Sequence, residues 1–216
     1  MFRDRIDAGE QLLERLPELD PAESVILALP RGGVPLAEII AQALGAPLDV
    51  IFVRKVGVPG HRELALAAVT DGEEPALTIN EDVARMAGLN VDRIWELAEP
   101  ELREIARRRK SYLGGHPSAP IKGKTVVVVD DGIATGATMR ASLKLIRVKE
   151  PAKIILAVPV APPEVLEDIG NLVDEVVCLH KPRPFYAVGA HYKLFDQVSD
   201  DAVAKALERQ HLKPSQ

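Results

Sequence analysis

Residues 125–138 read T-V-V-V-V-D-D-G-I-A-T-G-A-T. Four consecutive valines without polar alternation predict a strand that is buried on both faces, as in a parallel sheet covered by helices. Two carboxylates, Asp130 and Asp131, follow the valines, and apolar residues recur at helical spacing after the next loop. The stretch therefore predicts a strand, an acidic loop and a helix whose first amides face the sheet edge, where a phosphate is the usual ligand.

The loop after the acidic pair has the chemistry of a phosphate site. Gly136 lets the backbone approach an anion closely, and the Thr135 and Thr138 hydroxyls add donors beside the free amides. Each hydrogen bond to a charged group contributes about 1.5–3 kcal/mol, against about 0.3–1 kcal/mol for an exposed helix terminus, so hydrogen bonds would dominate binding. The loop lacks the lysine of a Walker motif, and no G-x-G-x-x-G turn for a dinucleotide is found.

The acidic pair calls for a partner other than the phosphate. Asp130 and Asp131 place two negative charges immediately before the anion site. A ribose diol, with or without Mg²⁺, would suit them, because carboxylates accept hydrogen bonds from hydroxyls and attract hard cations. The alternative is a polar strand end followed by a helix-capping loop.

A second strand, turn and helix is predicted near the amino terminus. The apolar run 24–29 precedes Pro-Arg-Gly-Gly at 30–33, and a helical pattern follows. Gly32 and Gly33 again expose amides at a helix start, and Arg31 adds a cation beside them.

A third apolar run, 48–53, is bounded by Arg54 and Lys55. Two cations at the carboxyl end of a strand lie where open parallel sheets bind ligands, so a diphosphate would suit them better than solvent alone. The segment 56–63 is small, kinked and polar, which predicts a mobile lid. Residues 64–69 then predict another strand or buried segment.

Residues 126–138 resemble the phosphoribosyl diphosphate (PRPP) binding motif of the type I phosphoribosyltransferases. The resemblance implies that Asp130 and Asp131 hold the ribose hydroxyls, and Mg²⁺ through the ribose or water. It also implies a catalytic role for both, together with Arg54 and Lys55. The implied 5′-phosphate ligands are Ala134, Thr135, Gly136, Ala137 and Thr138. At Ala134 the sequence departs from the 6-oxopurine transferases, which carry an aspartate thought to act on the base.

The same resemblance assigns the rest of the PRPP site. The turn at 30–33 corresponds to the pyrophosphate loop, and segment 56–63 to the catalytic loop that closes over PRPP. The implied pyrophosphate ligands are Arg31, Gly32, Gly33, Arg54 and Lys55. Members of the family are often homodimers.

The tail 181–195 concentrates aromatic residues, among them Phe185, Tyr186 and Tyr192. Aromatic faces stack on heterocycles, so Phe185 and Tyr186 are candidate binders of a nucleobase acceptor. The tail also resembles, faintly, the hood of hypoxanthine-type transferases, although no acidic residue follows Gly189 as it does there. Simple hydrophobic packing is the alternative.

Strand and helix patterns alternate along the chain, which predicts an α/β fold with an open, mostly parallel twisted sheet flanked by helices. We expect a single domain over residues 1–216, with 181–216 contributing to a small hood and a closing helix. The pattern predicts a turn at 71–75, mainly helical structure over 81–113 with a kink or a second helix at Pro100, and a frayed end from Gln210.

Composition limits the classes of partner. The 216 residues are 47% hydrophobic and 27% charged, with a formal net charge of −5 and one cysteine, Cys178. The net charge gives no reason to expect nucleic acid or an acidic membrane as partner, and the basic run 107–110 fits a helix end. One cysteine cannot form an internal disulfide, and no long apolar run is present, so we expect a cytoplasmic protein.

The sequence therefore predicts a phosphoribosyltransferase that moves the phosphoribosyl group of PRPP to a nitrogenous base, purine-like, and releases pyrophosphate. No residue is a convincing general acid or base, so catalysis would rest on positioning and charge. The alternatives are a PRPP-binding regulatory or sensor protein without transfer activity, and another phosphate-binding α/β enzyme such as a phosphatase or kinase.

Overall fold

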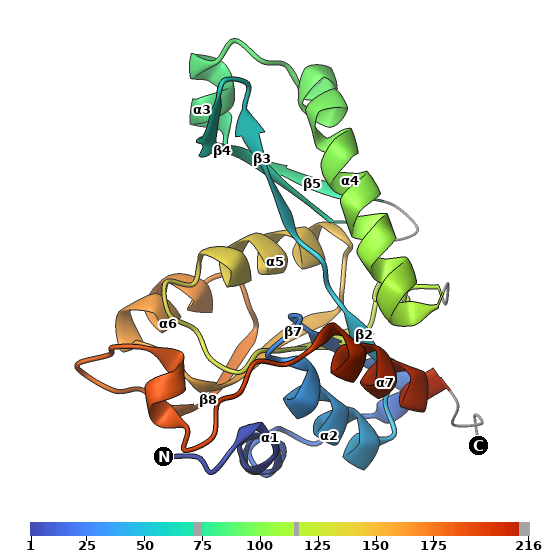
Figure 1. Ribbon diagram of the computed structural model, residues 1–216, viewed down its shortest axis with the longest axis vertical. Coiled ribbons are helices and arrows are strands. Elements are labelled where there is room, and N and C mark those ends of the chain that lie inside the picture. The colour runs from blue at the N-terminus through green and yellow to red at the C-terminus, as the bar shows by residue number, and fades with distance from the viewer. Residues whose placement is uncertain (71–74, 115–116, 212–216) are drawn as a thin grey trace.

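A computed structural model describes residues 1–70, 75–114 and 117–211 of the chain. Most of the turn predicted at 71–75 and most of the end predicted to fray lie outside these residues. The larger sheet has five parallel strands in the order β2-β1-β6-β7-β8 (Figure 1). Its strands are β1 (Ser24–Ala28), β2 (Leu48–Val50), β6 (Thr125–Val129), β7 (Lys153–Val160) and β8 (Glu175–His180). The predicted α/β class and parallel sheet are thus confirmed.

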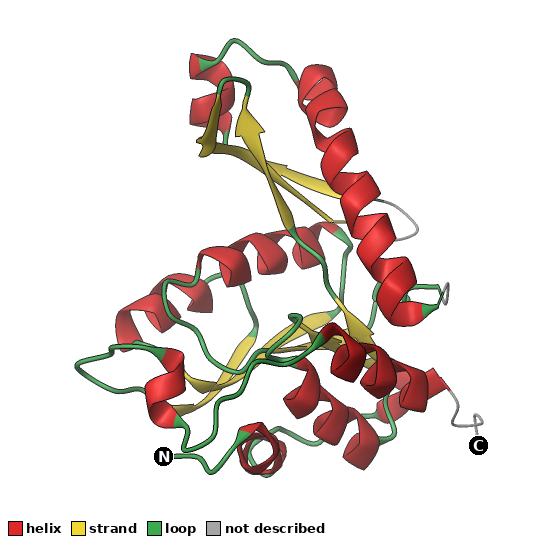
Figure 2. Ribbon diagram, viewed as in Figure 1, coloured by secondary structure: helices red, strands yellow, loops and turns green. Residues whose placement is uncertain are grey.

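Helices cover both faces of this sheet (Figure 2). Val127 and Val129 of β6 belong to the apolar cluster shared with the helices of one face, and Val126 and Val128 to the cluster of the other face. The first face carries α1 (Arg5–Leu13), α2 (Val34–Leu44) and α7 (Asp200–His211), and the second carries α5 (Ala137–Val148) and α6 (Pro163–Gly170). All four valines are fully buried, as their unbroken apolar run predicts.

A smaller lobe rises from one side of the main sheet (Figure 2). Its antiparallel sheet has the order β3-β4-β5, and two helices pack near it. The elements are β3 (Arg54–Val58), β4 (His61–Thr70), β5 (Ala76–Ile79), α3 (Glu81–Met86) and α4 (Val91–Leu113). Residues 56–63, predicted to be a lid loop, instead form the end of β3, a turn and the start of β4.

The structure also differs from the sequence prediction at the end of the third apolar run and at Pro100. The strand predicted over 48–53 ends at Val50, because the chain leaves the main sheet after the Ile51 amide donates to Ala28 O at 3.0 Å. Arg54 and Lys55 therefore begin β3 and do not end a strand of the main sheet. α4 continues through Pro100, whereas Gly88, with φ +66°, lies between α3 and α4.

The start of the chain pairs with the segment that precedes α7. Phe2 pairs with Tyr192 in an isolated parallel bridge, and the Phe2 amide donates to His191 O at 2.8 Å. The 3-10 turns η1 (Pro21–Glu23) and η2 (Val188–His191) complete the elements, and the rest of 181–199 is irregular. This pairing fixes the start of α1 against the tail, which matters for the site below.

Candidate active site at the carboxyl ends of β1 and β6

The loops that follow β1 and β6 touch each other at the carboxyl edge of the sheet. The peptide bond between Pro30 and Arg31 is cis. A Cβ atom added to Gly32 would lie 2.1 Å from Asp131 Oδ2, and one added to Gly33 would lie 2.4 Å from Val129 O. Glycine at both positions therefore allows the Pro-Arg-Gly-Gly turn to pack directly on the acidic pair, although the two motifs are about a hundred residues apart in the sequence.

Arg5, the first residue of α1, holds the side chain of Asp131. The Arg5 guanidinium donates to Asp131 Oδ2 from Nε at 2.9 Å and lies 2.7 Å from it through Nη2. Arg5 also donates to Asp196 O at 2.7 Å, and its guanidinium lies 4.0 Å from the centroid of the Phe195 ring. The Tyr192 hydroxyl donates to Asp131 O at 2.6 Å. The start of α1 and the tail therefore fix the acidic loop together.

The two acidic side chains differ in their electrostatic environment. Burial, and then the negative charge of Asp131, raise the pKa of Asp130 well above its ordinary value. Burial also raises the pKa of Asp131, but the Arg5 guanidinium opposes that rise through a hydrogen bond and its charge. The Arg5 guanidinium thus stabilises the ionised form of Asp131 within the protein. The ionised form of Asp130 is less well stabilised, so hydroxyl groups or a cation of a ligand would stabilise it more.

The loop 132–138 presents exposed groups at the start of α5. Ala134, Thr135, Ala137 and Thr138 are exposed, while Gly136 is buried in a left-handed conformation with φ +73°. A Cβ atom there would lie 2.6 Å from Val165 Cγ1, so glycine is required both by the backbone angle and by packing on α6. The loop therefore has a buried inner side and an accessible outer side at a helix start, the arrangement that suits an anion.

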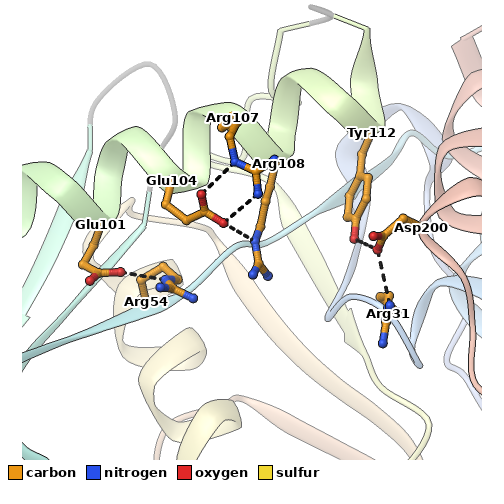
Figure 3. Close-up of polar contacts among 8 residues, drawn as sticks. All are labelled: Arg31, Arg54, Glu101, Glu104, Arg107, Arg108, Tyr112 and Asp200. Atoms are coloured by element: carbon orange, nitrogen blue, oxygen red, sulfur yellow. Dashed lines mark hydrogen bonds and ion pairs between the residues drawn. The ribbon is translucent and has the colours of Figure 1, made fainter. Parts of the chain in front are cut away.

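One cavity joins part of the predicted site. It has a volume of about 290 Å³ and is lined by Asp130, Thr138, Arg54 and Pro30, among other residues. The Arg54 Nε atom donates to Glu101 Oε2 of α4 at 2.7 Å (Figure 3). One residue of the acidic pair, Asp130, one residue of the phosphate loop, Thr138, and one predicted pyrophosphate ligand, Arg54, thus line a single cavity.

Comparisons with known proteins agree with this geometry. The family described as "Phosphoribosyl transferase domain" matches residues 5–193. The chain belongs to the phosphoribosyl transferase family. The match spans both glycine-containing loops and Arg5, so the transferase domain includes the contacts described above.

Two relatives show how far the similarity extends. A Mycobacterium tuberculosis protein named "Putative phosphoribosyl transferase Rv0571c" is 44% identical over 211 residues, which cover 98% of this chain and 47% of that protein. The chain thus spans about half the length of this curated relative. The crystal structure of TT1426 from Thermus thermophilus is similar with a TM-score of 0.82 and 40% identity, covering 97% of this chain and 98% of that one.

Two predicted pyrophosphate ligands of the transferase domain do not line the Asp130 cavity. Lys55 lines a separate cavity between β3 and α4, with Pro59 and Glu96 among its neighbours, because β3 turns away from the main sheet. Arg31 lines a third cavity and lies 3.5 Å from Asp200 Oδ1 through its Nη1 atom. Their assignment to pyrophosphate therefore stays a prediction, and the structure does not bring Lys55 to the acidic pair.

The predicted base-binding aromatics do not line the Asp130 cavity either. Phe185 stacks on His191 with ring centroids 5.6 Å apart, and Tyr186 is 83% exposed. The third aromatic of the tail, Tyr192, is buried and packs between Phe2 and Phe195. For Tyr192 the structure therefore agrees with simple hydrophobic packing, the alternative to binding a base. A base-binding role for Phe185 and Tyr186 stays a prediction.

The sequence pattern does not predict that Arg5 and Tyr192 contact the acidic loop. Arg5 lies at the start of an ordinary amphipathic helix, and nothing near it in the sequence points to an acid 126 positions away. The pairing of Phe2 with Tyr192 creates this contact, and an apolar residue beside a charged one, such as Phe2 beside Arg3, is too common a pattern to predict it.

A magnesium ion would fit the acidic pair as part of a ligand. The described side chains contain no group of three or more histidine, cysteine or acidic residues suited to holding a metal. Mg²⁺ is commonly bound through one or two carboxylates together with substrate phosphates and water, and Asp130 and Asp131 provide that number of carboxylates.

None of the helices in the described part of the chain combines the length and the apolar character that a membrane span requires.

Proposed function

We propose that this protein transfers the 5-phosphoribosyl group of PRPP to a nitrogenous base, purine-like, with release of pyrophosphate. The contact between the Pro-Arg-Gly-Gly turn and the acidic pair supports the proposal most. Gly32 packs on Asp131 where β1 and β6 end side by side, so a diphosphate loop and a ribose-binding pair would face one compound. A helix-capping loop alone gives no reason for a turn from another strand to pack so closely on two acids.

Each part of the proposed site has a separate task. Asp130 and Asp131 would accept hydrogen bonds from the ribose hydroxyls, and Arg5 orients Asp131 and favours its ionised form. The exposed amides and hydroxyls of the loop 134–138 would donate to the 5′-phosphate. Arg54 projects into the same cavity as Asp130 and would donate to the departing diphosphate.

A bound Mg²⁺, held by Asp130 and Asp131 through the ribose or water, would supply positive charge beside the leaving phosphates. Ala134 stands where 6-oxopurine transferases have an aspartate, so the chain would act through positioning and charge. Burial of the carboxylates at the sheet edge strengthens these interactions because it lowers the local dielectric constant.

Pyrophosphate release from PRPP, measured with Mg²⁺ and a panel of purine and pyrimidine bases, tests the proposal. We expect release that depends on both PRPP and one of the bases. The rival is a PRPP sensor, favoured by Ala134 and by the exposed position of Tyr186. PRPP binding without base-dependent release would support the sensor, and no PRPP binding at all would exclude both functions.

A further inference from the structure

A second cavity, of about 510 Å³, lies next to the Asp130 cavity. Three arginines line it: Arg31 from the Pro-Arg-Gly-Gly turn, and Arg107 and Arg108 from the last two turns of α4. The two cavities share Pro30, Phe52 and Arg108, so Arg108 borders both. The arginine cavity therefore continues the proposed active site toward α4 and α7.

Two carboxylates, Glu104 and Asp200, hold these arginines in place (Figure 3). Arg107 donates to both oxygens of Glu104, at 2.8 and 3.0 Å, and Arg108 Nε donates to Glu104 Oε1 at 2.8 Å. These hydrogen bonds, first from Arg107 and then from Arg108, lower the pKa of Glu104 to about 2. Two guanidinium groups thus share one carboxylate, which leaves donors for another anion.

The third arginine has a similar partner. Asp200, the first residue of α7, accepts a hydrogen bond from the Tyr112 hydroxyl and lies 3.5 Å from Arg31 Nη1 (Figure 3). Its side chain is 67% exposed, so water screens this ion pair and the pair contributes little to stability. A ligand anion could replace Asp200 beside Arg31 at small cost.

We propose that this arginine cavity is a subsite for a chain of two or more phosphates, with Arg31, Arg107 and Arg108 as its ligands. The planar guanidinium binds two phosphate oxygens at once, and three such groups from two elements surround a space larger than a single phosphate needs. Until the phosphates bind, Glu104 pairs with Arg107 and Arg108, and Asp200 pairs with Arg31. The phosphate chain has two sources: the diphosphate of PRPP itself, which rests on the proposed function, or a separate phosphorylated compound.

Titration calorimetry with inorganic pyrophosphate and Mg²⁺ tests this subsite. R107Q and R108Q should each weaken binding about 10-fold, the loss of roughly one charge-assisted hydrogen bond. E104Q should strengthen binding, because it removes a competing carboxylate. R103Q is the matched control: Arg103 pairs with Glu99 on the same helix, is exposed, and does not line either cavity, so we expect unchanged affinity.

R107Q is the more decisive variant, because Arg107 does not line the Asp130 cavity. If R107Q and R108Q bind pyrophosphate as well as R103Q does, the subsite is refuted, and base-dependent pyrophosphate release by the wild type would leave the proposed function intact. If the wild type binds neither pyrophosphate nor PRPP, both proposals fail.

A second arm separates the two sources. Pyrophosphate is titrated into protein already saturated with PRPP, in the absence of a base. Competition between the two would assign the subsite to the diphosphate of PRPP, and undiminished binding that R107Q still weakens would assign it to a separate phosphorylated compound. Either result supports the subsite, whereas binding that R107Q leaves unchanged refutes it.

Discussion

Arg5 pairs with Asp131 across 126 residues of the chain, with 2.7 Å between Arg5 Nη2 and Asp131 Oδ2. Both side chains are largely buried, with exposures of 12% and 14%. The pair links the first helix to the loop at the centre of the proposed site. It explains how two adjacent acids persist in a buried position, because one of them is neutralised within the protein.

Arg5→Gln should lower the free energy of unfolding by about 3 kcal/mol, because removing one partner of a buried ion pair leaves an unpaired buried charge. Urea unfolding measures this change. Arg3→Gln is the control, since Arg3 is 62% exposed and pairs with Asp4 at the surface; its effect should be much smaller than that of Arg5→Gln. Equal effects of the two substitutions would contradict a stabilising role specific to Arg5.

Asp130→Asn should raise the thermal stability of the ligand-free protein at neutral pH. The pKa of Asp130 is raised in the folded state, so its ionised form opposes folding, and the neutral amide removes that cost. As the pH falls through the raised pKa, the wild-type carboxyl takes up a proton and the advantage of the variant shrinks. Melting temperatures of both proteins from about pH 8 to about pH 5 test this, and a gap that widens toward low pH would reverse the assigned sign.

The same substitution should impair PRPP binding. Asp130→Asn and Asp131→Asn should each weaken the affinity for PRPP with Mg²⁺ by about 10-fold or more, if each loses about 1.5 kcal/mol of hydrogen bonding to the ribose. Calorimetry measures both variants beside the wild type. For Asp130→Asn, higher stability with lower affinity would identify a residue kept for function at the expense of folding, and unchanged affinity would reject its ribose role.

Gly32→Ala should abolish or strongly reduce PRPP binding, because its Cβ would lie 2.1 Å from Asp131 Oδ2 and the two loops would have to separate. Gly170→Ala is the matched control. A Cβ atom there meets no atom within 4 Å, and the residue ends α6, so this variant should bind PRPP normally and be as stable as the wild type or slightly more so. Normal binding by Gly32→Ala would show that the contact between the loops is not needed.

The sequence by itself determined the parallel sheet and the central motif. Four adjacent valines require burial on both faces, and the acids and glycines after them are local features whose meaning depends on a few neighbouring residues. For the same reason the Pro-Arg-Gly-Gly turn could be placed at a strand end before any contact was known. Local patterns of this kind need no information about distant parts of the chain.

The tertiary structure alone decided what meets at that motif. Arg5 reaches Asp131 because the amino terminus pairs with the tail, and Lys55 leaves the site because β3 joins a second sheet. The side chains of the basic run in α4 also lie in different places. Arg107 and Arg108 border a cavity, whereas Arg109 pairs with Asp49 of β2, with 3.1 Å between Nη1 and Oδ1. Side chains that act on a site from another element are placed by long-range packing, which leaves no periodic signal in the sequence around them.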